Sequence, residues 1–205
     1  MLSDEDMRKF GQKYSEWRSN RTIDEYELHG KILEYEESYF EDMTFQPNSE
    51  LYNTVQSMAN MFDYFSVELE SQYFTFRIQD LKNETMGRTN FPEREIIIAP
   101  KYKDDKSVIL HEMIHAYELT LQTEHSVLNE LLLLTLYKKL KPQISNLDSL
   151  IREHAELYGQ HCISSSGGTH GILFYLKSLD LDLRCEYKLG TVCGYGRDTG
   201  EMWYY

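Results

Sequence analysis

The sequence is poor in the features that mark a special class of protein. It has four prolines and three cysteines in 205 residues, and charged residues make up 27% of the chain. Hydrophobic residues make up 41%, without a long apolar run. These values are typical of a soluble globular protein. The length allows one domain of ordinary size with a substantial core.

We expect no segment for export or membrane insertion in this chain. Residues 1–6 are acidic and contain no apolar stretch of the kind that a secretory signal needs. The most apolar segment, residues 127–137, has about half the length of a membrane span and includes Asn129 and Glu130. We therefore predict a buried helix there, no membrane partner and a cytoplasmic location.

Paired cysteines are absent as well. Cys162, Cys185 and Cys193 are odd in number and form no CxxC pair. Without a secretory signal, this pattern predicts reduced thiols rather than a disulfide framework. Two cysteines seven residues apart cannot complete a four-cysteine zinc site by themselves.

Basic clusters are the last notable absence. Lys and Arg total 21 against 34 Asp and Glu, which gives a formal net charge of −13. Proteins that bind nucleic acid through phosphates need a basic surface. The charge therefore argues against a nucleic-acid partner.

What the chain does contain is the segment His111-Glu112-Met113-Ile114-His115. Two histidines four residues apart lie on one face of a helix, so both rings can reach one metal ion. Zinc takes imidazole nitrogens at about 2.0–2.1 Å. Glu112 is placed to act as a general base, which is the HExxH arrangement of zinc peptidases.

A catalytic zinc site generally has three protein ligands and one open position. Glu118 shares the helical face but lies about 10 Å beyond His111 along the axis, at about 1.5 Å per residue. A straight helix cannot present all three groups to one ion, so we expect Glu118 to support the site or line its cleft. The third-ligand candidates are Glu118, His125, Glu130, His154, His161 and His170.

The sequence gives an expectation for four more of these candidates. Glu130 would give a thermolysin-like site, with a downstream glutamate as the third ligand. His170 precedes an apolar helical run, and the neighbouring Gly168 and Gly171 allow close backbone approach. His154 is expected to lie at the surface, as is His161.

The pattern of helices and strands predicts an α+β fold. Helices are expected over residues 1–45 and 50–68, and strands over 73–78, 85–89 and 94–99. Gly87 permits a bulge or a close approach of another group. Asp104 or Asp105 can cap the helix that carries the two histidines. Two helices split near Lys141 and Pro142 follow, then a helix from His170.

We expect one domain over residues 1–205. It would comprise a helical N-terminal extension (1–45), a helical insert (122–166) and a β-rich tail (184–205). The tail is expected to form a hairpin of residues 192–195 against residues 201–205, with turn residues at 197–200. No internal repeat is visible.

Several of these pieces, in their order along the chain, resemble the SprT-like family of zinc metallopeptidases. The matching segments are residues 85–89, 95–100 and 110–117, followed by His170-Gly171 with Phe174. The resemblance implies a zincin-like fold with the HExxH helix on a small mixed sheet. It also implies that His111, His115 and His170 bind zinc and that Glu112 is the catalytic base. The stretch from residue 116 to residue 169 is longer than the family's usual spacer.

The function expected from this resemblance is a zinc metalloendopeptidase acting on a protein or peptide substrate. The likeness to zincins further implies that the strand over residues 96–98 forms the edge of the cleft and pairs with an extended peptide. Two alternatives stay open: a zinc-stabilised binding module without proteolytic activity, and the thermolysin-like site with Glu130.

Overall fold

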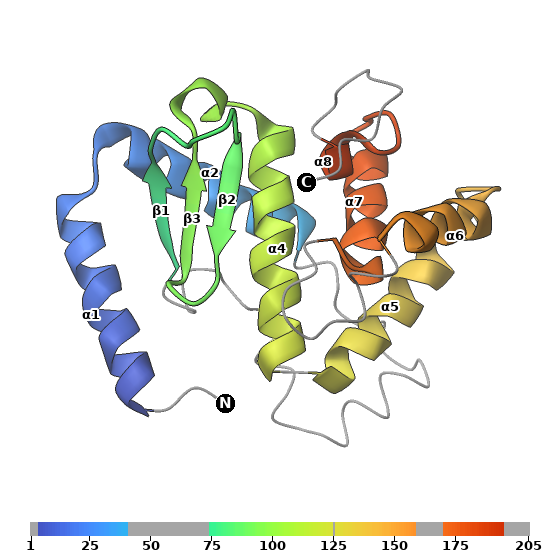
Figure 1. The fold of residues 1–205 in the computed structure, drawn as a ribbon, viewed down its shortest axis with the longest axis horizontal. Helices are drawn as coiled ribbons and strands as arrows, with labels where there is room; N and C mark the ends of the chain where they lie inside the picture. The colour runs from blue at the N-terminus through green and yellow to red at the C-terminus, as the bar shows by residue number, and fades with distance from the viewer. Residues whose placement is uncertain (1–3, 41–73, 125, 159–169, 195–205) are drawn as a thin grey trace. The chain divides into compact units, whose positions relative to one another are not determined.

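The structure of this protein, a computed structural model, describes residues 4–40, 74–124, 126–158 and 170–194. Among these residues it contains helices and a small mixed sheet (Figure 1), so the expected α+β class is confirmed. The chain divides into two compact units, residues 1–116 and residues 117–205. The expectation of one domain stays a prediction.

The first unit begins with two helices, α1 (Asp4–Asn20) and α2 (Ile23–Tyr39), as the sequence predicts for this region. Thr22 and Glu25 form a capping box at the start of α2, which satisfies backbone N–H groups that the first turn leaves without partners. Trp17 of α1 is buried and donates its indole N–H to the Phe76 carbonyl at 2.9 Å. This bond ties α1 to the sheet.

The sheet consists of β1 (Thr75–Ile78), β2 (Gly87–Asn90) and β3 (Glu95–Ile98) in the order β1-β3-β2. β3 pairs in parallel with β1 and antiparallel with β2, and Gly87 lies opposite Ile98. The three predicted strands are therefore confirmed.

The expectation that residues 96–98 form a cleft edge is wrong. β3 is the central strand, so both of its hydrogen-bonding sides are occupied by strands. All four of its residues are buried, which fits a central position. Within the described residues, β2 has a strand on one side only, so β2 is the edge strand beside the HExxH helix.

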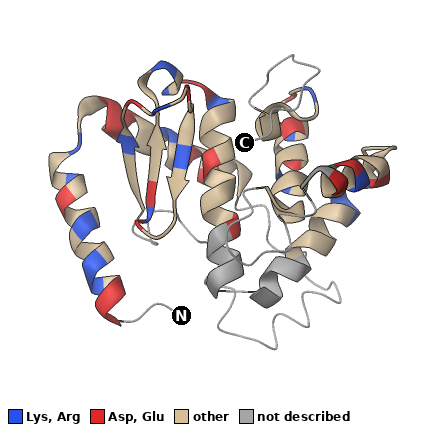
Figure 2. Ribbon diagram, in the orientation of Figure 1, with Lys and Arg blue, Asp and Glu red and all other residues tan. Residues whose placement is uncertain are grey.

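The HExxH helix, α4 (Lys106–Glu124), follows a short 3₁₀ turn (Pro100–Tyr102). The Asp105 carboxylate accepts hydrogen bonds from the backbone N–H and the hydroxyl of Ser107, at 3.0 Å and 2.7 Å. The prediction that Asp104 or Asp105 caps this helix is confirmed for Asp105. Between Lys106 and Glu118, the charged residues of α4 are Lys106, Glu112 and Glu118 (Figure 2), and both glutamates are buried.

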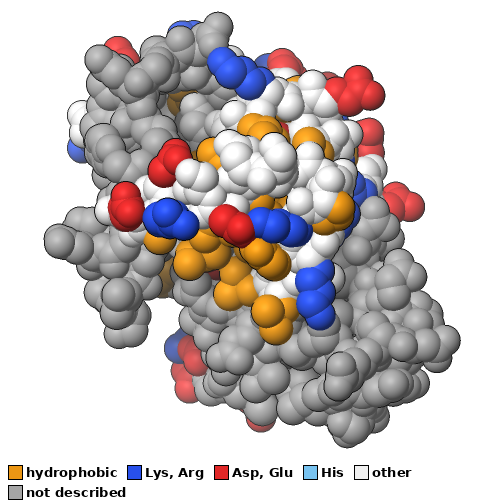
Figure 3. Space-filling view, turned by 90° about the vertical axis from the view of Figure 1, so that its right-hand side faces the viewer, with side chains coloured by type: hydrophobic (Ala, Val, Ile, Leu, Met, Phe, Trp, Pro, Cys, Tyr) orange, Lys and Arg blue, Asp and Glu red, His pale blue; other side chains and the backbone are white. Residues whose placement is uncertain are grey.

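The second unit contains α5 (Ser126–Leu140), α6 (Leu147–Tyr158), α7 (Ile172–Arg184) and the short α8 (Thr191–Gly194). α7 packs against the other three. The predicted pair of helices split near Lys141 is confirmed. Hydrophobic side chains reach the surface on the side shown in Figure 3, and α5, α6 and α7 line a mostly apolar pocket. None of the residues lining this pocket is a histidine.

The expected strand over residues 192–195 is wrong for its described part, because Thr191–Gly194 is helical. The buried Asp182 of α7 explains this: its carboxylate accepts hydrogen bonds from the backbone N–H groups of Gly190 and Val192, at 2.6 Å and 2.9 Å. These bonds hold the chain in a turn rather than an extended strand.

Some predictions fall on residues that the structure does not describe. These are the helix over 50–68, the turn over 197–200 and the second hairpin strand over 201–205. Cys185 and Cys193 are free thiols, as expected, and Cys162 lies outside the described residues. Among the helices that are described, none combines the length and the apolar character that crossing a bilayer requires.

Candidate metal centre

The two histidines of the HExxH segment point the same way from α4, as their spacing predicts. Their Nε2 atoms lie 3.1 Å apart, and their ring centroids are separated by 4.7 Å. Nitrogen donors on one zinc ion lie about 3–4 Å apart at ordinary bond lengths. His111 is buried and His115 is partly exposed, so the pair lies at the boundary between the core and the surface.

Glu112 is buried and is held by the edge strand β2. The Thr89 hydroxyl lies 2.9 Å from its carboxylate Oε2 and 2.8 Å from its backbone carbonyl, and it can donate to either oxygen. Gly87 lies under the same side chain: a Cβ there would come within 2.7 Å of Glu112 Cγ and Oε1. The strand therefore fixes where this carboxylate can lie, and a side chain at position 87 would displace it.

His170 lies at the start of α7, as predicted, directly before the helix N-cap Gly171. Its ring packs edge-to-face against Phe174, with ring centroids 4.7 Å apart. Burial, together with repulsion from His154, lowers the pKa of His170 to about 4. The imidazole is therefore neutral at physiological pH, which is the form that binds metal.

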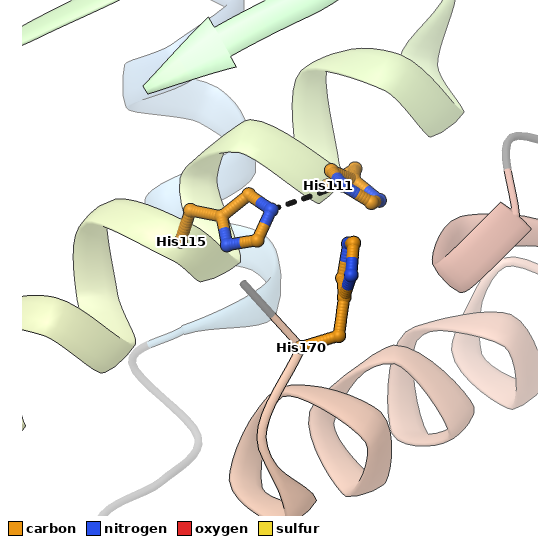
Figure 4. A group of neighbouring side chains, drawn as sticks. All are labelled: His111, His115 and His170. Carbon is orange, nitrogen blue, oxygen red and sulfur yellow. Dashed lines mark hydrogen bonds between the residues drawn. The ribbon is translucent and has the colours of Figure 1, made fainter. Parts of the chain in front are cut away.

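The structure brings His111, His115 and His170 together, and Figure 4 shows their rings turned toward one another. Each offers a ring nitrogen, and these atoms all lie within 4.8 Å of one another. Three imidazole nitrogens gathered in this way are a ligand set of the kind that binds a single metal ion. This group could hold a metal ion.

Of the other third-ligand candidates, Glu118 and His154 have described side chains, and neither belongs to this group. Glu118 is buried, and its carboxylate lies against Gly171 and accepts a hydrogen bond from the Phe174 backbone N–H. The expectation that Glu118 supports the site or lines its cleft stays a prediction. The side chains of His125, Glu130 and His161 lie outside the described part of the chain.

The expectation that His154 lies at the surface is wrong. His154 is 3% exposed and stacks on Tyr175, with ring centroids 4.1 Å apart. Its Nε2 lies 2.9 Å from the His170 carbonyl, to which it donates a hydrogen bond. Burial lowers the pKa of His154, and this hydrogen bond partly offsets the effect. A histidine on an amphipathic helix faces inward here because α7 offers both an acceptor and an aromatic surface.

Comparisons with known proteins return no matching family model, no matching curated protein and no matching solved structure. Conclusions about the site therefore depend on its own geometry.

Sequence reasoning named the three histidines, Glu112 and Gly87, but it missed the roles of Thr89 and His154. The signal for Gly87 was present, because a glycine inside a strand marks close approach of another group. No comparable signal distinguishes Thr89 or His154, since a threonine in a strand and a histidine on a helix are both common. Their contacts follow from tertiary packing.

Proposed function

We propose that this protein is a zinc-dependent metalloendopeptidase of the SprT-like type. The observation that carries the proposal is the group of His111, His115 and His170, whose ring nitrogens lie within 4.8 Å of one another next to a buried glutamate. Three histidines leave one position of a tetrahedral ion open, which is the pattern of catalytic rather than structural zinc sites. The order of the segments along the chain supports the same family.

Zinc, when bound, would supply Lewis acidity, lowering the pKa of water toward about 7 and polarising a carbonyl oxygen. Glu112 acts as the general base: it takes a proton from the attacking water and passes it to the leaving amine. Thr89 and Gly87 keep the Glu112 carboxylate in one place while the proton moves. A positioned base of this kind contributes roughly 10²–10⁴-fold to the rate.

The substrate in this proposal is an extended protein or peptide segment. β2 is an edge strand within the described residues, and it contacts the base directly through Thr89. An exposed strand edge can pair with an extended peptide through backbone hydrogen bonds. We therefore assign this role to β2 in place of β3. The net charge of −13 argues against a nucleic-acid partner, so the proposal includes none.

The test combines metal content with peptidase activity. Wild-type protein and Glu112→Gln are loaded with zinc and incubated with a fluorescently labelled unfolded protein, and bound zinc is measured for both. We expect about one zinc per chain in each, with the rate of Glu112→Gln lower by roughly 10²–10⁴-fold. Glu156→Gln, at an exposed position of α6, is the matched control and should keep full activity.

Two outcomes would redirect the proposal. Zinc-loaded wild-type protein that cleaves no unfolded protein or peptide would favour the zinc-stabilised binding module. A variant His170→Ala that retains wild-type zinc affinity would remove His170 as the third ligand and bring Glu130 back into consideration.

A further inference from the structure

The start of α7 lacks the side-chain cap that most helices have. Its N-cap residue is Gly171, so no side chain is available there to accept a hydrogen bond from the first turn. The first backbone N–H groups of a helix have no partner within the helix and need an acceptor from elsewhere. The helix start that follows His170 directly therefore depends on another part of the chain.

Glu118 supplies that acceptor. Its carboxylate accepts a hydrogen bond from the backbone N–H of Phe174, which is the third residue of α7. This is the N–H that an N-cap side chain ordinarily satisfies. Glu118 is only 3% exposed, and burial raises the pKa of its carboxyl to about 7. Its carboxylate has therefore been taken out of water to lie at this helix end.

The absence of a side chain at Gly171 is what lets Glu118 approach. A Cβ at position 171 would lie 2.5 Å from Glu118 Oε1, well inside any ordinary contact distance. The φ angle of Gly171 is −68°, which any residue can adopt. The glycine is therefore required by this close approach and not by its backbone conformation.

The other side of His170 is held as well. His154 donates a hydrogen bond to the His170 carbonyl at 2.9 Å, and its ring stacks on Tyr175 in the first turns of α7. The backbone is thus held at His170 itself and again at Phe174, the third helical residue. Between these two points the chain has little freedom to turn the His170 ring away.

We propose that Glu118 is a positioning residue for the third metal ligand: its carboxylate caps α7 in place of an N-cap side chain and so fixes His170. The proposal rests on the three-histidine metal site proposed above. Glu118 of α4 thereby contacts the start of α7, directly after His170. Residues that orient metal ligands without touching the metal typically change metal affinity by about 10–100-fold when they are removed.

The main experiment compares Glu118→Ala and Glu118→Gln with wild type by chelator competition for zinc. Glu118→Ala loses the acceptor, so we expect zinc affinity to fall by about 10–100-fold. Glu118→Gln keeps a carbonyl oxygen that can accept from Phe174, so its affinity should stay within roughly threefold of wild type. Equal affinities of wild type and Glu118→Ala would overturn the proposal.

A control separates positioning from a general loss of stability. Asp182→Ala removes another buried carboxylate of the same unit, one that accepts backbone N–H bonds at the far end of α7. We expect both alanine variants to lower the melting temperature, while only Glu118→Ala changes the visible absorption of the cobalt-substituted site. An equal spectral change in Asp182→Ala would overturn the proposal, because the effect would then report stability alone.

The route through His170 is tested by combining variants. If Glu118 acts through His170, then Glu118→Ala should weaken zinc binding in wild type and have no further effect in His170→Ala. Additive losses of affinity would show that Glu118 acts elsewhere. If wild-type protein bound no zinc at all, the proposed function would fail. If wild-type protein bound zinc and Glu118→Ala bound it equally well, only the Glu118 proposal would fail.

The glycine offers an independent check. Gly171→Ala should displace the Glu118 carboxylate and weaken zinc binding to the level of Glu118→Ala. In the double variant the crowding is relieved, so its affinity should be no weaker than that of Glu118→Ala alone. A double variant weaker than both singles would contradict the contact that we propose.

Discussion

Glu112 and Glu118 are both buried on α4, and each places its carboxylate against a glycine of another element. Glu112 lies over Gly87 of β2, and Glu118 lies over Gly171 at the start of α7. In both places a Cβ would come within 2.7 Å of the glutamate side chain. We call the surroundings of Glu112 the first region and the surroundings of Glu118 the second region. Both use the same packing arrangement, in which a glycine makes room for a carboxylate.

The regions differ in what donates to each carboxylate. Glu112 is within hydrogen-bond distance of the Thr89 hydroxyl, a group that can turn toward either of two oxygens. Glu118 accepts from the backbone N–H of Phe174 at a helix start, where the N-cap Gly171 makes no side-chain cap bond. A hydroxyl donor can turn to follow a carboxylate whose protonation changes, whereas a helix N–H keeps its acceptor in one place. We infer that the first serves chemistry and the second serves ligand geometry.

The largest expected effect comes from crowding the first region with Gly87→Ala. The atoms that a Cβ would meet are the far end of a flexible side chain, Glu112 Cγ and Oε1, so the carboxylate moves and the strand does not. A displacement of about 1 Å at a reacting group can cost about 10²-fold in rate. We expect the peptidase rate to fall by about that factor, measured at saturating zinc, with zinc affinity within a few-fold of wild type.

The matched control for Gly87→Ala is Gly30→Ala in α2, where an added Cβ meets nothing within 4 Å. It should leave both activity and zinc affinity unchanged. Gly171→Ala is a second comparison, because that variant is expected to lower zinc affinity, whereas Gly87→Ala is expected to lower the peptidase rate. If Gly87→Ala weakened zinc binding as strongly as Gly171→Ala does, the two glutamates would not have separate tasks.

The second prediction concerns the protonation of Glu118 in the zinc-free protein. Burial raises the pKa of its carboxyl from 4.5 to about 7. The folded protein therefore keeps a proton that the unfolded chain releases. This contribution to stability is complete below about pH 4.5 and is lost as the pH rises through about 7. Glu118→Gln stays neutral at every pH, so its stability should not fall in this way as the pH rises.

The measurement is the free energy of unfolding in urea for wild type and Glu118→Gln, after zinc is removed by chelation. Between pH 5.5 and pH 8 we expect the variant to gain roughly 2 kcal/mol relative to wild type. Glu156→Gln, exposed on α6, should show no such gain. Parallel pH profiles for wild type and Glu118→Gln would mean that Glu118 is charged at its helix end throughout this range.

Much of the first region could be predicted from sequence because local rules govern it. The spacing of His111 and His115 predicts a shared helical face, and Asp105 is the residue type that begins helices. The position of β3 was predicted, but its place in the sheet was not. Strand order depends on tertiary packing, although the run of three isoleucines, Ile96 to Ile98, is itself typical of a strand buried on both faces.

The second region depends on contacts between residues far apart in sequence, so less of it could be predicted. His170 was found through a family resemblance, whereas the roles of Glu118 and His154 follow from packing against α7. The hairpin expected at residues 192–195 is wrong for a similar reason. Asp182 lies outside that segment, and its hydrogen bonds turn the segment into a short helix. Local patterns carry no information about such an acceptor.

The smallest expected effect is that of Thr89→Val, which removes the rotatable donor from the first region and keeps the shape of the side chain. A hydrogen bond to a charged group is worth about 1.5 kcal/mol or more, and 1.36 kcal/mol corresponds to a tenfold change in rate. We expect kcat to fall about tenfold, with KM and zinc affinity unchanged, because both hydrogen bonds given for the Thr89 hydroxyl are to Glu112. Thr89→Ser keeps the hydroxyl and should retain most of the activity. If Thr89→Val were as active as wild type, packing on Gly87 alone would position Glu112. The difference between the Thr89 hydroxyl and the backbone donor at Glu118 would then have no effect on catalysis.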